Sequence, residues 1–225
     1  MAITIRQQLD QSGLFQHFPA DAKQKLAGFC HTQIYADGEM IYLKGDEPTA
    51  LYGVLDGAIK LIGENPSGKF FLFGLEGPGR WFGESSALDG ERRGQSAQAV
   101  GEARILSLPR GDLMKLLDAK PELYRHFVSV FCRRLRLAGE RFEDTAFLPV
   151  NIRLAKNLLQ MHRVREQHGI KLPQEELAAS LGVTRQSIYR VIKEWQQKGW
   201  VSTHYGDVRV ESVEQLQLLV NNYVG

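Results

Sequence analysis

The stretch Pro173-Gln-Glu-Glu-Leu-Ala-Ala-Ser-Leu-Gly-Val-Thr-Arg-Gln-Ser-Ile-Tyr-Arg-Val-Ile192 decides the fold of the last third of this chain. Its apolar spacing predicts two short helices, Gln174 to Leu181 and Thr184 to Lys198. Between them, Gly182 supplies a turn conformation that a Cβ would disfavour. This spacing predicts a helix-turn-helix. The residues that follow, Trp200 to Val210, alternate like a β-hairpin and predict a wing.

The second of these helices carries side chains suited to reading double-stranded DNA. An arginine can bridge O6 and N7 of guanine, and a glutamine can bridge N6 and N7 of adenine. We therefore expect Arg185, Gln186 and Arg190 to contact bases in the major groove. Contacts with the DNA backbone are expected from a second set of residues, namely Gln174 near the amides that begin the first helix, Thr184, Ser187, Lys193, and His204 and Arg209 of the wing.

Composition and charge narrow the class of protein. The 225 residues are 43% hydrophobic and 24% charged, which is ordinary for a globular protein and excludes a disordered chain. The net charge of +2 is too small to indicate a nucleic-acid partner. However, residues 1–149 carry 18 Lys+Arg against 19 Asp+Glu, and residues 150–225 carry 10 against 7. A polyanion would therefore bind the C-terminal third.

The region from Thr32 to Leu108 is a series of short β-type runs separated by glycine turn signals such as Asp37-Gly38, Asp56-Gly57 and Asp89-Gly90. This spacing predicts a small antiparallel barrel or jelly roll, and residues 7 to 29 predict short helices packed on its outside. The predicted fold class is α+β, with a β-roll before the winged helix-turn-helix.

A long helix is predicted between Pro121 and Ala146, and it has two apolar faces. One stripe follows a heptad seam, made of Tyr124, Val128, Phe131, Leu135, Ala138 and Phe142. The other, made of Leu123, Phe127, Val130 and Leu137, is expected to cover the roll. Two faces suggest that the heptad seam pairs with a second copy of the chain. The alternative is a helix buried between two domains of one subunit.

These elements give a predicted domain organisation. Pro149 should end the long helix, and Asn151 is a plausible cap for a helix from Ile152 to Gln167. We expect four segments, which are a β-roll domain at 1–120, a dimerisation helix at 121–146, a hinge at 147–150 and the DNA-binding domain at 151–225.

Metal and redox sites are not supported by the pattern. Cys30 and Cys132 lie far apart, so we expect neither a disulfide nor an iron–sulfur cluster. Haem would need His17, His31 or His126, and each is more simply a surface or interface histidine, so we expect no haem and no metal site.

Neither membrane insertion nor catalysis is expected. The sequence has no signal peptide and no apolar run of about 18 residues, so we expect a cytoplasmic protein with no membrane partner. A jelly-roll enzyme would need clustered histidines and carboxylates, but the roll contains only His31. Nucleophile and phosphate-loop motifs are also missing, so we expect no enzymatic activity.

Several motifs together resemble one family of bacterial transcription regulators. They are Asp56-Gly57 after LYGVL, Gly79-Arg-Trp-Phe-Gly-Glu84, Phe147-Leu148, and Thr184-Arg-Gln-Ser-Ile-Tyr-Arg190. The chain resembles the cyclic-AMP receptor and fumarate–nitrate regulator (CRP/FNR) family over nearly its whole length. The resemblance implies a homodimer that reads a palindromic operator through Arg185 and Arg190, and that touches RNA polymerase if it is an activator.

The same resemblance implies an effector site in the roll, but this site departs from the pattern. Gly83 and Glu84 match the pair that begins the family's phosphate-binding cassette, with Ser85 following. The phosphate arginine could be Arg93, but Gly94 stands where a serine should follow. Where the long helix of the family holds adenine with a polar pair, this chain has Ala138-Gly139. These losses argue against cyclic AMP, and they leave open a different small molecule at these residues or a roll that is only a dimer scaffold.

Overall fold

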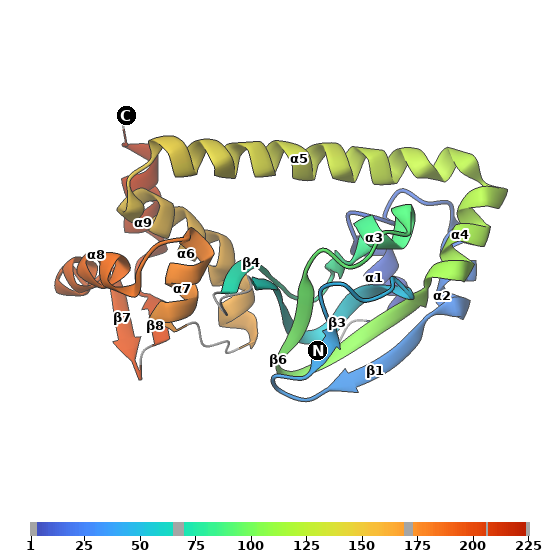
Figure 1. Cartoon of the computed structure of the whole chain (residues 1–225), viewed down its shortest axis with the longest axis horizontal. Coiled ribbons are helices and arrows are strands. Elements are labelled where there is room, and N and C mark those ends of the chain that lie inside the picture. The colour runs from blue at the N-terminus through green and yellow to red at the C-terminus, as the bar shows by residue number, and fades with distance from the viewer. Residues whose placement is uncertain (1–3, 65–69, 169–172, 206, 224–225) are drawn as a thin grey trace. The chain divides into compact units, whose positions relative to one another are not determined.

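The computed structural model describes residues 4–64, 70–168, 173–205 and 207–223 (Figure 1). The chain divides by packing into two compact units, Met1–Gly63 with Leu75–Arg136, and Glu64–Gly74 with Leu137–Gly225. The division falls inside the long helix α5 (Tyr124–Phe147), which we expected to be a segment of its own.

The first unit contains the predicted N-terminal helices. A capping box begins α1, because the Thr4 hydroxyl accepts from the Gln7 amide (3.2 Å) and the Gln7 side chain accepts from the Thr4 amide (2.9 Å). The helices of this unit before α5 are α1 (Ile5–Gln11), α2 (Ala20–Phe29), α3 (Glu84–Asp89), α4 (Arg110–Ala119) and the 3₁₀ turn η1 (Pro121–Leu123).

The β-roll is built on one sheet in the order β1-β6-β3-β4. Strand β6 pairs antiparallel with β1, β2 and β3, and β5 pairs antiparallel with β3. The strands are β1 (His31–Tyr35), β2 (Met40–Tyr42), β3 (Ala50–Glu64), β4 (Phe70–Glu76), β5 (Trp81–Phe82) and β6 (Ser96–Pro109). The predicted α+β fold class is confirmed by this sheet and by the helices around it.

One predicted turn is instead a bulge. Asp56-Gly57 lies within β3, whose pairing with β6 shifts register on both sides of Asp56. Gly57 has φ +73, and a Cβ there would lie 2.4 Å from the carbonyl oxygen of Glu102. Only glycine fits this position, so the prediction that the chain turns here was wrong, although the need for glycine was read correctly.

Two apolar clusters stabilise the first unit. In one, Phe15 packs edge-on against Trp81 (ring centroids 4.9 Å apart) and against Phe127 of α5 (5.9 Å). In the other, inside the sheet, the rings of Tyr42, Tyr52 and Phe82 lie 5.5 to 6.0 Å apart. The second cluster fills the interior of the roll with aromatic side chains.

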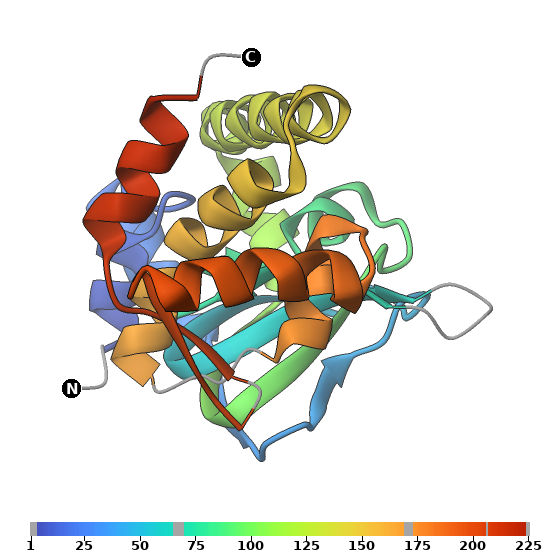
Figure 2. The same cartoon turned by 90° about the vertical axis from the view of Figure 1, so that its left-hand side faces the viewer.

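The second unit contains the winged helix-turn-helix (Figure 2). Its remaining elements are α6 (Val150–His168), α7 (Gln174–Leu181), α8 (Arg185–Gln197), β7 (Val201–His204), β8 (Asp207–Val210) and α9 (Val213–Asn221). Asn151 is not a helix cap, because α6 already begins at Val150 and Asn151 lies in its first turn. Helix α9 begins after an N-cap, in which the Ser212 hydroxyl accepts from the Gln215 amide (3.3 Å). The sequence pattern did not predict this helix.

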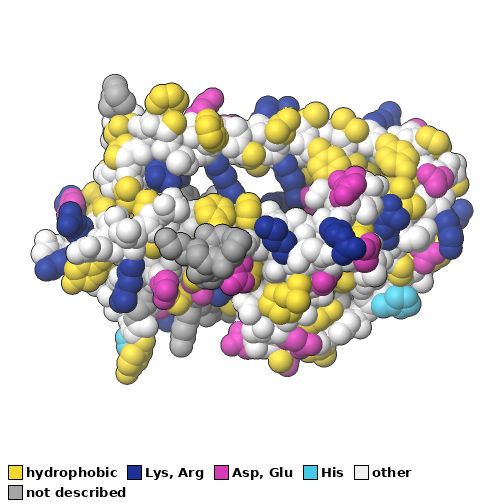
Figure 3. All heavy atoms as spheres, in the orientation of Figure 1, with side chains coloured by type: hydrophobic (Ala, Val, Ile, Leu, Met, Phe, Trp, Pro, Cys, Tyr) yellow, Lys and Arg dark blue, Asp and Glu magenta, His cyan; other side chains and the backbone are white. Residues whose placement is uncertain are grey.

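Helix α5 has apolar side chains along its length (Figure 3). Of the stripe expected to cover the roll, Leu123, Phe127 and Val130 are buried in the first unit's core. Leu137 is 49% exposed, because the apolar contacts of α5 with this core end at Phe131. No helix among the described residues is long and apolar enough to cross a membrane.

Candidate functional site

The helix-turn-helix has a well-packed core. Leu177, Ala178, Ile188 and Trp195 are buried between α7, α8 and their neighbours. Helix α7 ends at Gly182, whose φ of +65 is the left-handed conformation that the sequence predicts. The two helices are therefore held at a fixed angle by contacts on one side of each, which leaves the other side of α8 for a partner.

The outer side of α8 presents the residues expected to read DNA. Arg185, Gln186 and Arg190 are exposed, as is Lys193 one turn further on. No described carboxylate forms an ion pair with Arg185, Arg190 or Lys193. Their guanidinium and ammonium groups can therefore donate to bases or phosphates without first breaking a contact in the protein.

The expected backbone-contact residues begin with those around the two helix N-termini. The Thr184 hydroxyl caps α8 by accepting from the Ser187 amide (3.2 Å) and also lies 2.8 Å from the Ser187 hydroxyl. Gln174 is half-buried in the first turn of α7, where its Oε1 has no hydrogen-bond partner in the structure as described. Both N-termini leave backbone amides available to an anion.

The wing, formed by β7 and β8, is joined to α8 by a side-chain hydrogen bond. The side chain of Gln196 donates to the Thr203 hydroxyl (2.8 Å), and Val208 of the hairpin is fully buried. His204 and Arg209, the expected backbone contacts, are both exposed. Nε of Arg209 lies 3.3 Å from a carboxylate oxygen of Asp207, so this arginine is oriented by its neighbour in the chain.

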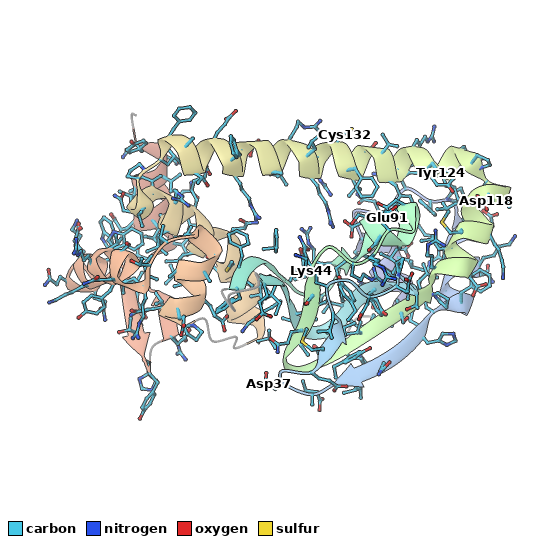
Figure 4. All side chains as sticks on the ribbon, in the orientation of Figure 1. Asp37, Lys44, Glu91, Asp118, Tyr124 and Cys132 are labelled. Atoms are coloured by element: carbon cyan, nitrogen blue, oxygen red, sulfur yellow. The ribbon has the colours of Figure 1, made fainter. Side chains whose placement is uncertain are left out.

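The heptad seam of α5 divides into packed and exposed positions. Tyr124 and Phe131 are half-buried against the core of their own unit, and the Tyr124 hydroxyl donates to Asp118 (3.3 Å; both are labelled in Figure 4). The other positions lack such packing. Ala138 is exposed, and the exposed fractions of Val128, Leu135 and Phe142 are 57%, 75% and 78%. An apolar stripe of this exposure is unfavourable in water.

The cassette at the start of α3 contains a buried carboxylate that forms an ion pair with α5. Glu84 is buried, and one of its oxygens accepts from the Arg134 guanidinium of α5, which also donates to the carbonyl of Trp81 (3.2 Å). The other oxygen, Oε2, is buried and has no hydrogen-bond partner among the described groups. Burial raises the pKa of Glu84, and the charge of Arg134 opposes that shift.

Arg93, the residue considered for a phosphate, lies within the protein instead of facing an open site. Its Nη1 donates to the Gly83 carbonyl (2.8 Å) and to the Ser86 hydroxyl (3.1 Å), and its Nη2 donates to the Ala50 carbonyl. The guanidinium lies 4.4 Å from the ring centroid of Tyr42. Arg93 is thus brought beside Gly83 as expected, but its terminal donors already serve protein acceptors.

The remaining expected effector residues are Ser85, Gly94 and Ala138, and none of them has a side-chain contact with this cluster in the described structure. Ser85 and Gly94 are exposed, and Ala138 lies on α5 one turn beyond Arg134. Sequence reasoning missed Arg134 and Ser86. No signal in the sequence marks either residue, because their partners lie 50 and 7 positions away and a fold is needed to bring them together.

The cysteines and histidines form no metal-binding cluster among the described residues. Cys132 is exposed on the outer side of α5 (Figure 4), and Cys30 is half-buried with its pKa raised by burial to about 12. The rings of His17 and His126 stack 6.0 Å apart at the surface of the first unit.

Comparisons with known proteins match both regions. The cyclic nucleotide-binding domain model matches residues 32–120, and the Crp-like helix-turn-helix domain model matches residues 152–219. The chain is 30% identical to the cyclic AMP receptor protein of Thermus thermophilus, over 92% of this chain and 95% of that protein. It is 28% identical to a CRP-like cAMP-activated global transcriptional regulator of Mycobacterium tuberculosis, over 92% of this chain and 96% of that protein.

Solved structures agree with these matches. A transcriptional regulator of the CRP/FNR family from Thermus thermophilus shares 26% identity, with a TM-score of 0.70 over 85% of this chain and 99% of that one. The catabolite activator protein of the same organism shares 28% identity, with a TM-score of 0.55 over 95% and 100%. The chain therefore belongs to the CRP/FNR family and is a DNA-binding transcription regulator.

Proposed function

We propose that the chain acts as a homodimer that places two copies of α8 in successive major grooves of a palindromic operator, about 34 Å apart. The observation that carries this proposal is the exposed apolar stripe of α5, formed by Val128, Leu135 and Phe142. Two such stripes at heptad spacing bury each other when the helices pair. A two-fold pair of helices also relates the two recognition helices by the same symmetry, which a palindrome matches.

Within each half-site, the proposed base contacts are those of Arg185 and Arg190 with guanines and of Gln186 with an adenine. Their exposure and their lack of ion pairs with described carboxylates support these roles. The proposed DNA backbone contacts are Thr184, Ser187, Lys193, the amides near Gln174, and His204 and Arg209 of the wing.

The hydrogen bonds of Arg93 argue against cyclic AMP as the ligand of the β-roll. To turn both terminal nitrogens toward its phosphate, Arg93 would have to leave acceptors on Gly83, Ser86 and Ala50, and each buried acceptor left unpaired costs about 1 to 3 kcal/mol. We therefore propose that DNA binding does not require cyclic AMP. Oε2 of Glu84 is buried without a hydrogen-bond partner among the described residues, so a ligand that reached it would donate to it through a hydroxyl or amine group.

The dimer proposal is tested by two matched variants of α5. Leu135→Asp places like charges on the seam, so we expect monomers by sedimentation and loss of palindrome binding. Leu137→Asp, the same change at an exposed apolar position outside the seam, should remain dimeric. Phe131 is a poor choice for this test, because it also packs against its own unit's core. A dimeric Leu135→Asp variant would place the interface elsewhere.

Selection of bound DNA from a random library tests the operator and the effector together. We expect a palindrome to be enriched, and we expect its affinity to be unchanged by millimolar cyclic AMP. A tenfold gain in affinity with cyclic AMP would contradict the effector proposal. Repeating the selection with a metabolite extract would show whether another ligand matters.

We further propose that the chain acts in the cytoplasm by binding alone, without catalysis, and that it contacts RNA polymerase if it is an activator.

A further inference from the structure

A cavity of about 490 Å³ lies within the second unit. Its walls come from β4, the C-terminal half of α5, α6 and the end of α7, and every lining residue belongs to that unit (β4, α6 and α7 are labelled in Figure 1). Small-molecule sites usually have volumes of roughly 300 to 1,000 Å³. Gly182, in the turn of the helix-turn-helix, is part of the lining, so a ligand here would contact that turn.

One part of the lining is apolar and incompletely covered. Phe71 and Phe73 of β4 are 40% and 39% exposed, and their rings meet edge-on with centroids 4.9 Å apart. Leu137 of α5, which is also half-exposed, lines the same cavity. Apolar surface left in water is unfavourable, and aromatic rings favour edge-on or offset contact with another ring. A ligand with a flat apolar body would therefore gain free energy by covering these side chains.

The helices add charged groups to the lining, with cations in excess. The cations are Arg141, Arg153 and Lys156, and the carboxylates are Glu140 and Asp144. Lys156 and Asp144 form an ion pair and largely neutralise each other. The remaining excess of one positive charge attracts an anionic ligand and disfavours a cationic one.

The cations of the cavity differ in how many donors the fold already uses. Both terminal nitrogens of Arg141 donate within the protein, Nη1 to a carbonyl of β4 (3.1 Å) and Nη2 to Gln160 (3.0 Å). Arg153 donates through Nη2 to the carbonyl that ends α7, and Lys156 pairs with Asp144. No other acceptor for Arg153 or Lys156 is found among the described residues, so both side chains keep donors for a ligand.

We propose that this cavity binds a small amphipathic anion, whose flat apolar body covers Phe71 and Phe73 and whose carboxylate accepts from Arg153 and Lys156. The site is separate from the Glu84 cluster of the roll, and its lining contains no residue that we propose to contact DNA. Ligand binding alone therefore tests it, and its failure would leave the operator proposal intact.

The first test uses the dye anilinonaphthalene sulfonate, which has the proposed chemistry and becomes more fluorescent when its rings leave water. We expect the natural chain to bind one dye molecule per chain, in a saturable way. Phe71→Ala should weaken this binding about tenfold, because part of the apolar lining is lost. Leu137→Ala, on a different element of the same lining, should also weaken it.

Phe70→Ala is the matched control for the dye. Phe70 is the neighbour of Phe71 on β4 and is similarly exposed (37%), but it does not line the cavity. Its substitution should leave the affinity for the dye unchanged. Thermal midpoints of the three variants, measured alongside, show that each one folds.

The second test fixes the charge of the ligand with three compounds that share one naphthalene body. Naphthoate should displace the dye at about tenfold lower concentration than naphthylmethanol, the gain expected from one charge-assisted hydrogen bond. Naphthylmethylamine should be the weakest of the three. Lys156→Gln should weaken naphthoate about tenfold and leave naphthylmethanol unchanged, because only the carboxylate uses the lost ammonium. A purely structural effect of this substitution would weaken both compounds.

Several outcomes would overturn the proposal. A natural chain that binds no dye has no such site. Dye binding that Phe71→Ala and Leu137→Ala leave unchanged, or that Phe70→Ala lowers equally, would place the dye elsewhere on the chain. Equal displacement by naphthoate and naphthylmethanol, or stronger displacement by the amine, would show that the cavity does not select an anion. A selection that enriches no operator would contradict the DNA-binding proposal and leave this one standing.

Discussion

The β-roll and the helix-turn-helix each contain arginines that sequence patterns assign to an anionic partner, but the two regions hold them differently. Arg93 is buried, and its guanidinium donates to two backbone carbonyls and a hydroxyl. Arg185 and Arg190 are exposed and form no ion pair with a described carboxylate. An arginine is thus available to a ligand only when its donors do not already serve acceptors of the fold.

The largest expected effect is that of removing Arg93. Arg93→Ala leaves three acceptors and a cavity in the roll, so we expect the free energy of unfolding of the first unit to fall by about 3 to 5 kcal/mol. Urea denaturation, followed by hydrogen exchange of the β3 and β6 amides, measures this loss. Sequence preference in DNA binding should be unchanged.

A matched control for this prediction lies one residue away. Arg92 is exposed and pairs with Glu47 (2.8 Å), so Arg92→Ala should lower the unfolding free energy by less than about 1 kcal/mol. Similar losses for the two variants would mean that the contacts of Arg93 add little, and the contrast between the two regions would then be lost.

The next effect concerns Arg134 and depends on pH. Arg134→Ala leaves the buried Glu84 carboxylate without its cation, and we expect a cost of roughly 3 kcal/mol at pH 8, at the low end for a buried pair because Arg134 is partly exposed. Burial already raises the pKa of Glu84 in the folded state, so folding favours its protonated form. Stability lost at high pH should therefore be recovered as the pH is lowered.

Thermal unfolding of Arg134→Ala and of the natural chain at pH 5 and pH 8 measures this difference. Arg133→Ala, which removes an exposed neighbour on α5, should show the same small effect at both values. A deficit for Arg134→Ala that does not shrink at pH 5 would mean that the lost contact with the Trp81 carbonyl, and not the charge of Glu84, causes the damage.

The two regions also differ in how far sequence could predict them. The helix-turn-helix is set by contacts within about 20 residues, and the conformation of Gly182 and the cap at Thr184 follow from local preferences. The environment of Arg93 is not local, because Ala50 lies 43 positions away and is brought close by the sheet. Sequence therefore suggested Arg93 as a phosphate ligand near Gly83, but it could not show that Nη1 and Nη2 of Arg93 already donate to the fold.

A similar limit applies to glycine signals and to helix ends. A bulge and a turn both require positive φ, so Asp56-Gly57 could be read either way until its pairing with β6 was known. Helix α6 begins at Val150, one residue before the expected cap. The Arg153 amide donates a hydrogen bond to the Pro149 carbonyl (3.2 Å) and extends the helix to this point, and a residue pattern does not specify such a bond.

The smallest expected effects are on α8, where they change binding and leave folding intact. Arg185→Ala should weaken operator binding by about 1 to 3 kcal/mol and relax preference at one base position, because a bidentate base contact is lost. Lys193→Ala should weaken all sequences alike and lower the slope of log affinity against log salt by about 1. Titrations at several salt concentrations, on the operator and on a scrambled duplex, separate the two.

Neither variant of α8 should lower the thermal midpoint, because both side chains are exposed and free of ion pairs with described carboxylates. This is the opposite of the result expected for Arg93→Ala, which should lose stability and keep specificity. If Arg185→Ala and Lys193→Ala gave the same salt slope and the same loss on both duplexes, the base and phosphate roles would be wrongly divided. In that case, exposure would identify side chains that can reach DNA, but it would not distinguish a side chain that contacts bases from one that contacts phosphate.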